Sequence, residues 1–311
     1  MQKACTYCNT LRRAIPANNF CSQTGDQISS VGNNAFYIQA NDLQSGEHQS
    51  RLSIRAVFNG YHFHQVSKVD HVVHTQNYLV VNEGQSYYSA IQAERALEAL
   101  IIAFRPGFIG QLFSDRKTKE GYLLDDPFRE NVDSMGFYEN TYPRNPGMRI
   151  LLQEARQAIV EEVQDNLYLE ELFTRMGEAL LDQHGLLNHD LEKFEARKAS
   201  TRQELFRRIS TTKDYLDSHL SERLSLQDLS KIATLSPYHL LRTFKAFYGL
   251  APHQYLTQQR LKYAHYLLEE STESITQIVT ECGFESHSSF GRLFKRQFGH
   301  PPKAIRQQRN Y

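Results

Sequence analysis

Residues 236–245 read SPYHLLRTFK, and residues 286–295, fifty positions later, read SHSSFGRLFK. The serine, the arginine and the phenylalanine–lysine pair occupy the same places in both stretches. The agreement continues with Tyr248-Gly249 against Phe298-Gly299 and with Pro252 against Pro302. The small residue ahead of each stretch also recurs, as Ala233 and Gly283. The last third of the chain therefore contains one structural unit twice.

Each copy has the pattern of two helices joined by a tight turn. In the first copy, apolar residues at helical spacing predict a first helix with a buried face formed by Leu226, Leu229, Ile232 and Ala233. Ser236 and Pro237 then suit the N-cap and the first position of a second helix. Small residues near the turn allow the two helices to cross closely, as a helix-turn-helix unit requires.

The second helix of each copy is expected to bury two large side chains that lie four residues apart, Leu240 with Phe244 and Phe290 with Phe294. Arg242 and Arg292 then point away from the core. Between the copies, Pro252 to Glu270 reads as one helix of nineteen residues, which would be about 28 Å long. That length is close to the roughly 34 Å between successive major-groove faces on one side of DNA. The repeat is therefore expected to engage DNA at two places.

Residues 226–305 resemble the DNA-binding domain of the AraC/XylS family of bacterial transcription regulators. The resemblance rests on SPYHLLRTFK, on Gly249-Leu250-Ala251-Pro252, on Arg260-Leu261 and on the segments that follow, which are Ile278, Cys282-Gly283-Phe284, residues 286–290, Phe294-Lys295-Arg296 and residues 299–302. It implies an α+β chain. An amino-terminal cupin-like β-barrel or sandwich with trailing helices would precede an all-α double helix-turn-helix domain.

The resemblance also implies which side chains would contact DNA. The base-edge readers would be Tyr238, Leu241 and Arg242 in the first unit and His287, Ser288, Ser289 and Arg292 in the second. Leu241 departs from the polar residue often found there, so it is expected to touch a thymine methyl instead of forming a hydrogen bond. The phosphate contacts would be Ser236, Lys245, Ser286, Lys295 and Arg296. Each arginine alone could also be a phosphate contact or a helix-end salt bridge.

Charge and composition fit this division of the chain. Residues 202–311 contain 16 basic and 10 acidic residues, a balance of +6, although the whole chain has 35 of each sign and therefore the remainder carries −6. A basic module joined to an acidic one suits a polyanion-binding domain beside a domain with a different task. The four cysteines, the lack of a long apolar run and the polar first residues predict a soluble cytoplasmic protein with no membrane association.

The expected organisation has four parts. Residues 1–34 are a polar segment without firm structure, and residues 35–188 are a regulatory and dimerisation domain in which strands precede two helices. Residues 51–59 alternate as in a half-buried strand, and Ile150, Leu151, Ala155, Ile159 and Val163 mark the buried stripe of the first helix. Residues 189–202 are a charged linker. Residues 203–311 form the DNA-binding domain, with its units at 225–248 and 274–298.

Two groups of side chains in the first half are candidates for further chemistry. His62 and His64 alternate on a strand, a spacing usable for metal ligation. However, residues 65–70 supply no glutamate, so surface or hydrogen-bonding histidines are expected here. Cys5 and Cys8 have only Cys21 nearby, which is too few for a zinc site. Neither a cofactor nor a metal is expected. An aromatic-lined pocket could involve Tyr37, Tyr61, Phe63, Tyr87 and Tyr88.

The sequence thus predicts a sequence-specific DNA-binding transcription regulator, an activator that responds to an effector, and not an enzyme. The resemblance implies promoter DNA and RNA polymerase as partners, a homodimer formed through the amino-terminal domain, and a small-molecule effector of unknown identity. Two alternatives remain open. One is a metal-dependent cupin enzyme with a DNA-targeting tail, and the other is a regulator controlled by another protein.

Overall fold

The computed structural model describes residues 11–15, 32–45, 47–119, 136–192 and 199–309. It divides the chain into an amino-terminal unit, Met1–Arg202, and a carboxy-terminal unit, Gln203–Tyr311. Cys5, Cys8 and Cys21 lie outside the described residues. The expected linker at 189–202 includes the end of one helix and the start of another, and its residues 193–198 also lie outside the described part.

Strands precede helices in the amino-terminal unit. Its elements are β1 (Leu11–Ile15), β2 (Asn34–Gln44), β3 (His48–Gln49), β4 (Ser53–Val57), β5 (Tyr61–Val66), β6 (Val69–His74), β7 (Asn77–Val81), β8 (Ser86–Ala103), α2 (Phe108–Lys119), β9 (Thr141–Pro143), α3 (Pro146–Val160) and α4 (Asn166–Glu192). In its described residues, the polar segment 1–34, for which no firm structure was expected, therefore includes the strand β1. That strand, β1, pairs with β2, whose backbone groups supply the partners that local sequence could not reveal.

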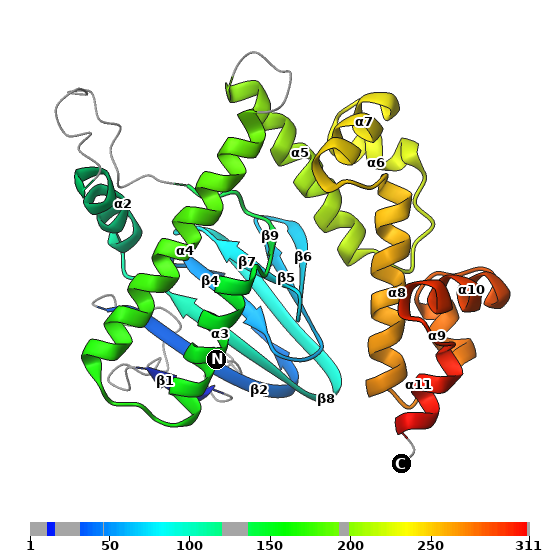
Figure 1. The fold of residues 1–311 in the computed structure, drawn as a ribbon, viewed down its shortest axis with the longest axis horizontal. Helices are drawn as coiled ribbons and strands as arrows, with labels where there is room; N and C mark the ends of the chain where they lie inside the picture. Colours follow the sequence, from blue (N-terminus) through cyan, green and yellow to red (C-terminus); the bar gives the residue numbers. More distant parts are fainter. Residues whose placement is uncertain (1–10, 16–31, 46, 120–135, 193–198, 310–311) are drawn as a thin grey trace, which may run out of the picture. The chain divides into compact units, whose positions relative to one another are not determined.

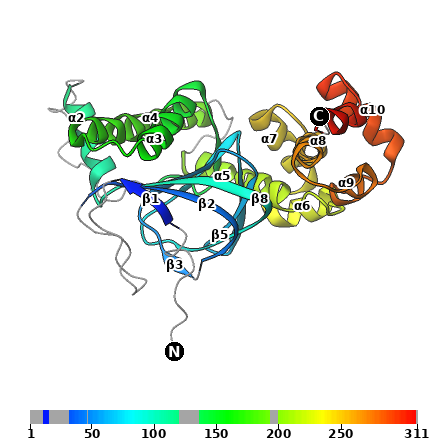
Figure 2. The ribbon, with the colours of Figure 1, turned by 90° about the horizontal axis from the view of Figure 1, so that it is seen from below.

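The strands form an antiparallel sheet that closes nearly into a barrel (Figure 2). Its path runs β1-β2-β8-β4-β7-β9; β5 joins this path through β8, and β6 pairs with β5. The long strand β8 makes the closure possible because its first half pairs with β3 and β5 and its second half pairs with β4, while β2 pairs along both halves. The fold confirms the α+β class with a barrel followed by helices.

The barrel interior is lined by one set of alternating side chains, and the other set faces the helices or solvent. The apolar part of the interior includes Phe36, Ile38, Val57, Val66, Val73, Leu79, Val81, Ile91 and Ile101. In β4 all five residues are buried, although the alternation predicted a half-buried strand. Ser53 and Arg55 share the inward face with Val57, so this strand places polar side chains inside the barrel.

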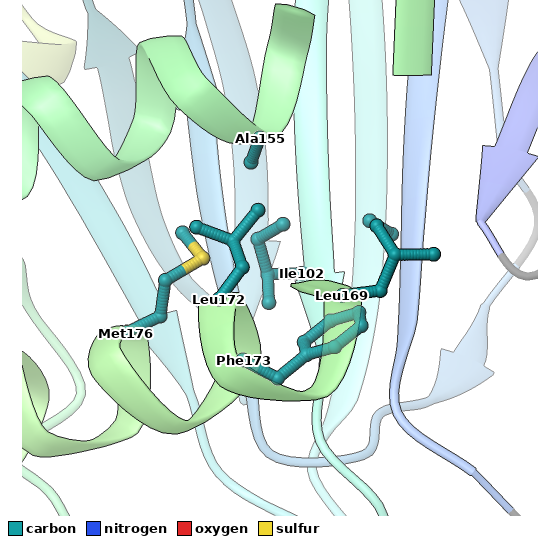
Figure 3. A pocket seen from close by; sticks show the side chains of 7 residues that line it. Ile102, Ala155, Leu169, Leu172, Phe173 and Met176 are labelled. Atoms are coloured by element: carbon teal, nitrogen blue, oxygen red, sulfur yellow. The ribbon is translucent and has the colours of Figure 1, made fainter. Parts of the chain in front are cut away.

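Helices α2, α3 and α4 lie together along one side of the barrel (Figures 1 and 2). A small pocket between α3, α4 and the sheet is lined by apolar side chains, among them Ile102, Leu172 and Met176 (Figure 3). In α3 the buried stripe contains Leu151, Ala155 and Ile159 as predicted. Ile150 is 60% exposed, however, and Val163 lies beyond the helix end, because α3 stops at Val160.

The carboxy-terminal unit is helical throughout its described residues. Its helices are α5 (Ala199–Ser218, whose first residues precede the unit), α6 (Leu226–Ala233), α7 (Pro237–Tyr248), α8 (Pro252–Glu270), α9 (Ile275–Glu281), α10 (His287–Phe298) and α11 (Pro302–Arg309). Helix α8 lies between the two copies of the repeat and contacts α7 on one side and α9, α10 and α11 on the other (Figure 1). Across the described residues, no helix is both long and apolar enough to cross a bilayer.

Candidate nucleic-acid interface

The first helix-turn-helix unit is capped at both of its helices. Ser225 and Asp228 form a capping box at the start of α6, where each side chain accepts a hydrogen bond from the other residue's backbone N–H at 3.2 Å. Ser236 caps α7 and its hydroxyl accepts from the His239 N–H at 3.3 Å, with Pro237 at the first helical position. The predicted cap and proline are confirmed, and they set where α7 begins.

Because one face of α7 is buried, the side chains on its opposite face are at least partly exposed to solvent. Leu240 and Phe244 are both fully buried, which confirms them as core residues. Tyr238 is 75% exposed and Arg242 is exposed as well. Leu241 is half-buried, so it offers only part of its side chain to the surface. The outer face of α7 thus combines an aromatic side chain, an aliphatic one and a guanidinium group.

The second unit repeats this arrangement with different side chains. Ser274 and Gln277 form the capping box of α9, and Ser286 caps α10 by accepting from the Ser289 N–H at 3.3 Å. Phe290 and Phe294 are buried, whereas the outer face of α10 exposes His287, Ser288 and Arg292. Ser289 is half-buried, and its hydroxyl accepts a long hydrogen bond of 3.5 Å from Arg292. Two exposed arginines therefore occupy equivalent places on the two second helices.

Basic and polar groups flank both outer faces. Lys245 lies in the last turn of α7, and Lys295 and Arg296 lie in the last turn of α10. All three are exposed, as are the capping serines Ser236 and Ser286. The first backbone N–H groups of a helix point along its axis and favour an anion there. Each second helix is thus bounded by groups suited to phosphate.

The turns of the two helix-turn-helix units differ in backbone conformation, although their sequences align. In the first unit α6 extends to Ala233, and Thr234 adopts the left-handed conformation with a φ of 50°. In the second unit α9 ends at Glu281, and Gly283 adopts that conformation with a φ of 70°. A Cβ atom on Gly283 would lie 2.8 Å from the backbone oxygens of Leu220 and Ser221. Glycine is therefore required here by close approach as well as by its backbone conformation.

Gly283→Ala is expected to lower the free energy of unfolding by about 2 kcal/mol or more, because two fixed backbone oxygens must move and the left-handed conformation is strained. Thermal unfolding of the full chain measures the effect. The matched control is Gly291→Ala in α10, where a Cβ would meet no atom within 4 Å. That change should instead stabilise the helix by about 0.5–1 kcal/mol. Equal effects of the two substitutions on the free energy of unfolding would contradict the requirement for glycine at position 283.

One arginine that the sequence did not single out for a role connects the segment after α5 with the turn of the second unit. Arg260 in α8 donates to the carbonyl oxygens of Leu220 at 2.6 Å, Glu222 at 2.6 Å and Gly283 at 2.9 Å. The first two oxygens follow α5, and the third belongs to the turn of the second unit. These contacts join residues 23 to 40 positions away from Arg260 in the chain, so no local pattern could have indicated them. They hold α8 against both neighbouring segments.

A buried charged cluster supports the first unit from the side of α5. Lys213 lies 3.0 Å from Asp214 and 2.9 Å from Asp217, measured between the ammonium nitrogen and a carboxylate oxygen. Tyr255 of α8 donates to both oxygens of Asp217, at 3.0 and 3.1 Å. Burial lowers the pKa of Lys213, but the two carboxylates raise it by more, so the ammonium remains charged. The cluster ties α5 to α8.

Comparison with known proteins also identifies a helix-turn-helix domain in the carboxy-terminal part of the chain. A family model described as a helix-turn-helix domain matches residues 229–308. The probable transcriptional regulator LumQ of Photobacterium leiognathi is 36% identical over 89 residues, which is 29% of this chain and 36% of LumQ. The transcriptional activator RhaS of Enterobacter sp. (strain 638) is 36% identical over 103 residues, 33% of this chain and 37% of RhaS.

Among solved structures, a transcriptional regulator from Chromobacterium violaceum with an AraC-type DNA-binding domain is 30% identical. The match covers 36% of this chain and 96% of that one, with a TM-score of 0.31. The curated relatives are matched over little more than a third of their length. The repeat and its capped helices agree with the family model. Residues 229–308 of this chain form a helix-turn-helix domain similar to parts of the transcription regulators LumQ and RhaS.

Proposed function

We propose that this protein is a sequence-specific transcription activator that reads two adjacent major-groove segments of promoter DNA and responds to an effector. The observation that carries the proposal is the pair of second helices, each of which exposes an arginine on the face opposite its buried aromatic or aliphatic pair. Arginine binds guanine through two hydrogen bonds in the major groove, where each base pair has a distinct pattern. Two such helices in one domain suit a bipartite site.

In this proposal the base-reading side chains are those on the outer faces of α7 and α10. Arg242 and Arg292 would contact guanine, and the half-buried Leu241 would touch a thymine methyl. Tyr238, His287, Ser288 and Ser289 would complete the contacts to base edges. The capping serines Ser236 and Ser286, with Lys245, Lys295 and Arg296, would contact phosphates and set the register.

The amino-terminal barrel would supply regulation and dimerisation, and RNA polymerase would be the partner in activation. The resemblance to the AraC/XylS family supports these roles and a cytoplasmic location, and the division of the chain into a barrel and a helical domain is consistent with them. The relatives that this chain matches are described as transcription regulators, which favours a regulator over the competing hypothesis of a metal-dependent enzyme. Among the described residues, no group of three or more His, Cys, Asp or Glu side chains is arranged to hold a metal ion.

Lys295→Ala is expected to weaken binding to all DNA sequences by a similar factor, because a phosphate contact carries no base information. The slope of log affinity against log salt should fall by about one unit. Titration of two unrelated duplexes at several salt concentrations measures both effects. Arg149→Ala is the matched control, since it removes one exposed positive charge from the amino-terminal unit. A changed base preference in Lys295→Ala would show that α10 is placed wrongly.

The proposed function is tested by in vitro selection of random duplex DNA with the full chain. The expected result is a bipartite motif whose halves are about one helical turn apart. A single short motif would mean that only one unit reads DNA. A folded protein that enriches no sequence would refute the proposal.

A further inference from the structure

The interior of the amino-terminal barrel contains a group of polar side chains that DNA binding does not use. We define the interior polar cluster as Arg55 of β4, His62 and His64 of β5, and Ser89 of β8. Each of these residues is at most 3% exposed. They share the inward faces of their strands with Val57, Val66 and Ile91, which belong to the apolar core of the barrel. The prediction of surface histidines is therefore wrong, since both imidazoles are buried.

The members of the interior polar cluster lie close together. The ring centroids of His62 and His64 are 4.0 Å apart. His64 is directly opposite Ser89 in the pairing of β5 with β8, so these two side chains lie on the same side of the sheet. The Arg55 guanidinium lies 3.8 Å from the ring centroid of Tyr87, which is two residues before Ser89 and faces the same interior. Strands β4, β5 and β8 thus bring the side chains of the interior polar cluster together inside the barrel.

Several polar atoms of the cluster have no hydrogen-bond partner in the structure. These atoms are Nε and one terminal nitrogen of Arg55, Nε2 of His62, both ring nitrogens of His64 and the hydroxyl oxygen of Ser89. The other terminal nitrogen of Arg55 donates to Ser50 at 3.4 Å, a long bond to a neutral group. Buried polar atoms are nearly always paired, and a buried charge nearly always has a counterion. This concentration of unpaired donors and acceptors gives the barrel interior a site suited to a polar ligand.

The charge of the cluster indicates the sign of that ligand. Burial, together with the positive charge of Arg55, lowers the pKa of His62 to about 3. Burial, the neighbouring His62 and Arg55 also place the pKa of His64 well below its ordinary range. Both imidazoles are therefore neutral near pH 7, and Arg55 supplies the one formal charge of the cluster. A cation would be repelled by Arg55, whereas an anion would be attracted.

We propose that the interior polar cluster binds the carboxylate of a small organic acid. The inference rests on the proposed function, because it assigns the effector class of the amino-terminal domain. A guanidinium group matches the two oxygens of a carboxylate, and neutral imidazoles and a hydroxyl can donate the remaining hydrogen bonds. One cation balances one carboxylate. The aliphatic side chains around the cluster, including Val57, Val66 and Ile91, suit a short apolar part of the same molecule.

The aromatic residues considered from the sequence do not form a pocket together. Phe63 is 44% exposed and Tyr88 is 37% exposed, and both alternate with inward-facing neighbours on their strands. Tyr37 donates instead to Glu98 at 2.7 Å. Of this group, Tyr87 lies at the interior polar cluster, where its ring stacks on the cation. The carboxylate site therefore depends on Arg55 and the histidines more than on aromatic side chains.

The test uses the full chain, sodium butyrate as the probe and butyramide as its neutral control. Isothermal titration at constant ionic strength is expected to show saturable binding of butyrate and at least tenfold weaker binding of butyramide. Arg55→Met should weaken butyrate binding at least tenfold, whereas Arg149→Met, which removes an exposed charge, should leave it unchanged. Equal binding of both probes, or binding of neither and of no other acid among acetate, hexanoate and benzoate, would overturn the proposal. The cluster would then hold water only.

A second measurement covers the case in which Arg55→Met does not fold. Nitrogen NMR of the wild-type imidazoles should show that butyrate shifts the resonances of His62 and His64, assigned through His62→Gln and His64→Gln. Unmoved resonances at saturating butyrate would overturn the site, as would inorganic phosphate producing the larger shifts. The DNA selection is independent of this titration. If the chain binds butyrate but selects no DNA, the carboxylate site is supported and the proposed DNA-binding function is refuted. If the chain selects DNA but binds no acid, the DNA-binding function is supported and the carboxylate site is refuted.

Discussion

Lys213→Ala should lower the free energy of unfolding of the carboxy-terminal domain by about 3–5 kcal/mol, because it leaves two carboxylates buried without their cation. Asp214 is fully buried and Asp217 is 6% exposed. Burial raises the pKa of Asp217, and the positive charge of Lys213 is the strongest effect that opposes this shift. Without the ammonium, Asp217 and Asp214 must be protonated or hydrated, and the packing of α5 against α8 must loosen.

Denaturant unfolding, combined with hydrogen exchange of peptides from α5 and α8, measures this loss. The exchange data assign the change to the carboxy-terminal domain, which a whole-chain signal alone would not do. The control is Lys231→Ala, whose side chain is 81% exposed. Exposed substitutions of this kind usually change stability by less than about 0.5 kcal/mol. If the two variants unfold at the same denaturant concentration, the buried cluster is not what stabilises this domain.

The double substitution Arg242→Ala with Arg292→Ala is expected to weaken binding to the selected DNA site by about 2–6 kcal/mol, because each bidentate contact to guanine contributes about 1–3 kcal/mol. The two arginines lie in separate units, so their effects should be nearly additive. Each single substitution should relax the preference at a different base pair. Equilibrium titration at one fixed salt concentration gives the affinity, and repeated selection gives the preference.

The matched control for the double variant is Arg149→Ala with Arg105→Ala, which removes two positive charges from the amino-terminal unit. Far-ultraviolet circular dichroism should be unchanged in both variants, since Arg242 and Arg292 lie on exposed helix faces. An unchanged selected motif in both single variants would contradict the assignment of these arginines to base reading. Loss of affinity with an unchanged motif would instead make them phosphate contacts.

The repeat could be predicted in detail because its signals are local. A serine followed by proline marks the start of α7, and Ser286 marks the start of α10. Apolar residues four positions apart decide which face is buried, and the opposite face then carries the arginine. These relations act over one or two helical turns and need no knowledge of the rest of the chain. The predicted caps and core pairs are accordingly found where the pattern placed them.

The barrel interior could not be predicted in the same way. Alternation along β5 shows that His62 and His64 share a face, but it does not show which face is inside. That choice depends on the pairing of β5 with residues 87–90 of β8 and of β4 with residues 99–103 of the same strand. Both pairings join segments far apart in sequence. The missing glutamate suggested surface histidines, whereas closure of the sheet buried them beside Arg55.

The sequence by itself determined the two helix-turn-helix units, their capped second helices and the outward direction of their arginines, because each follows from short-range periodicity and capping. The tertiary structure alone decided how Arg260 joins α8 to the segment after α5 and to the turn of the second unit, how Lys213 is buried with two carboxylates, and that Arg55, His62 and His64 meet inside the barrel. These arrangements depend on contacts between distant segments, and only chain folding brings such segments within reach of a hydrogen bond or a charge.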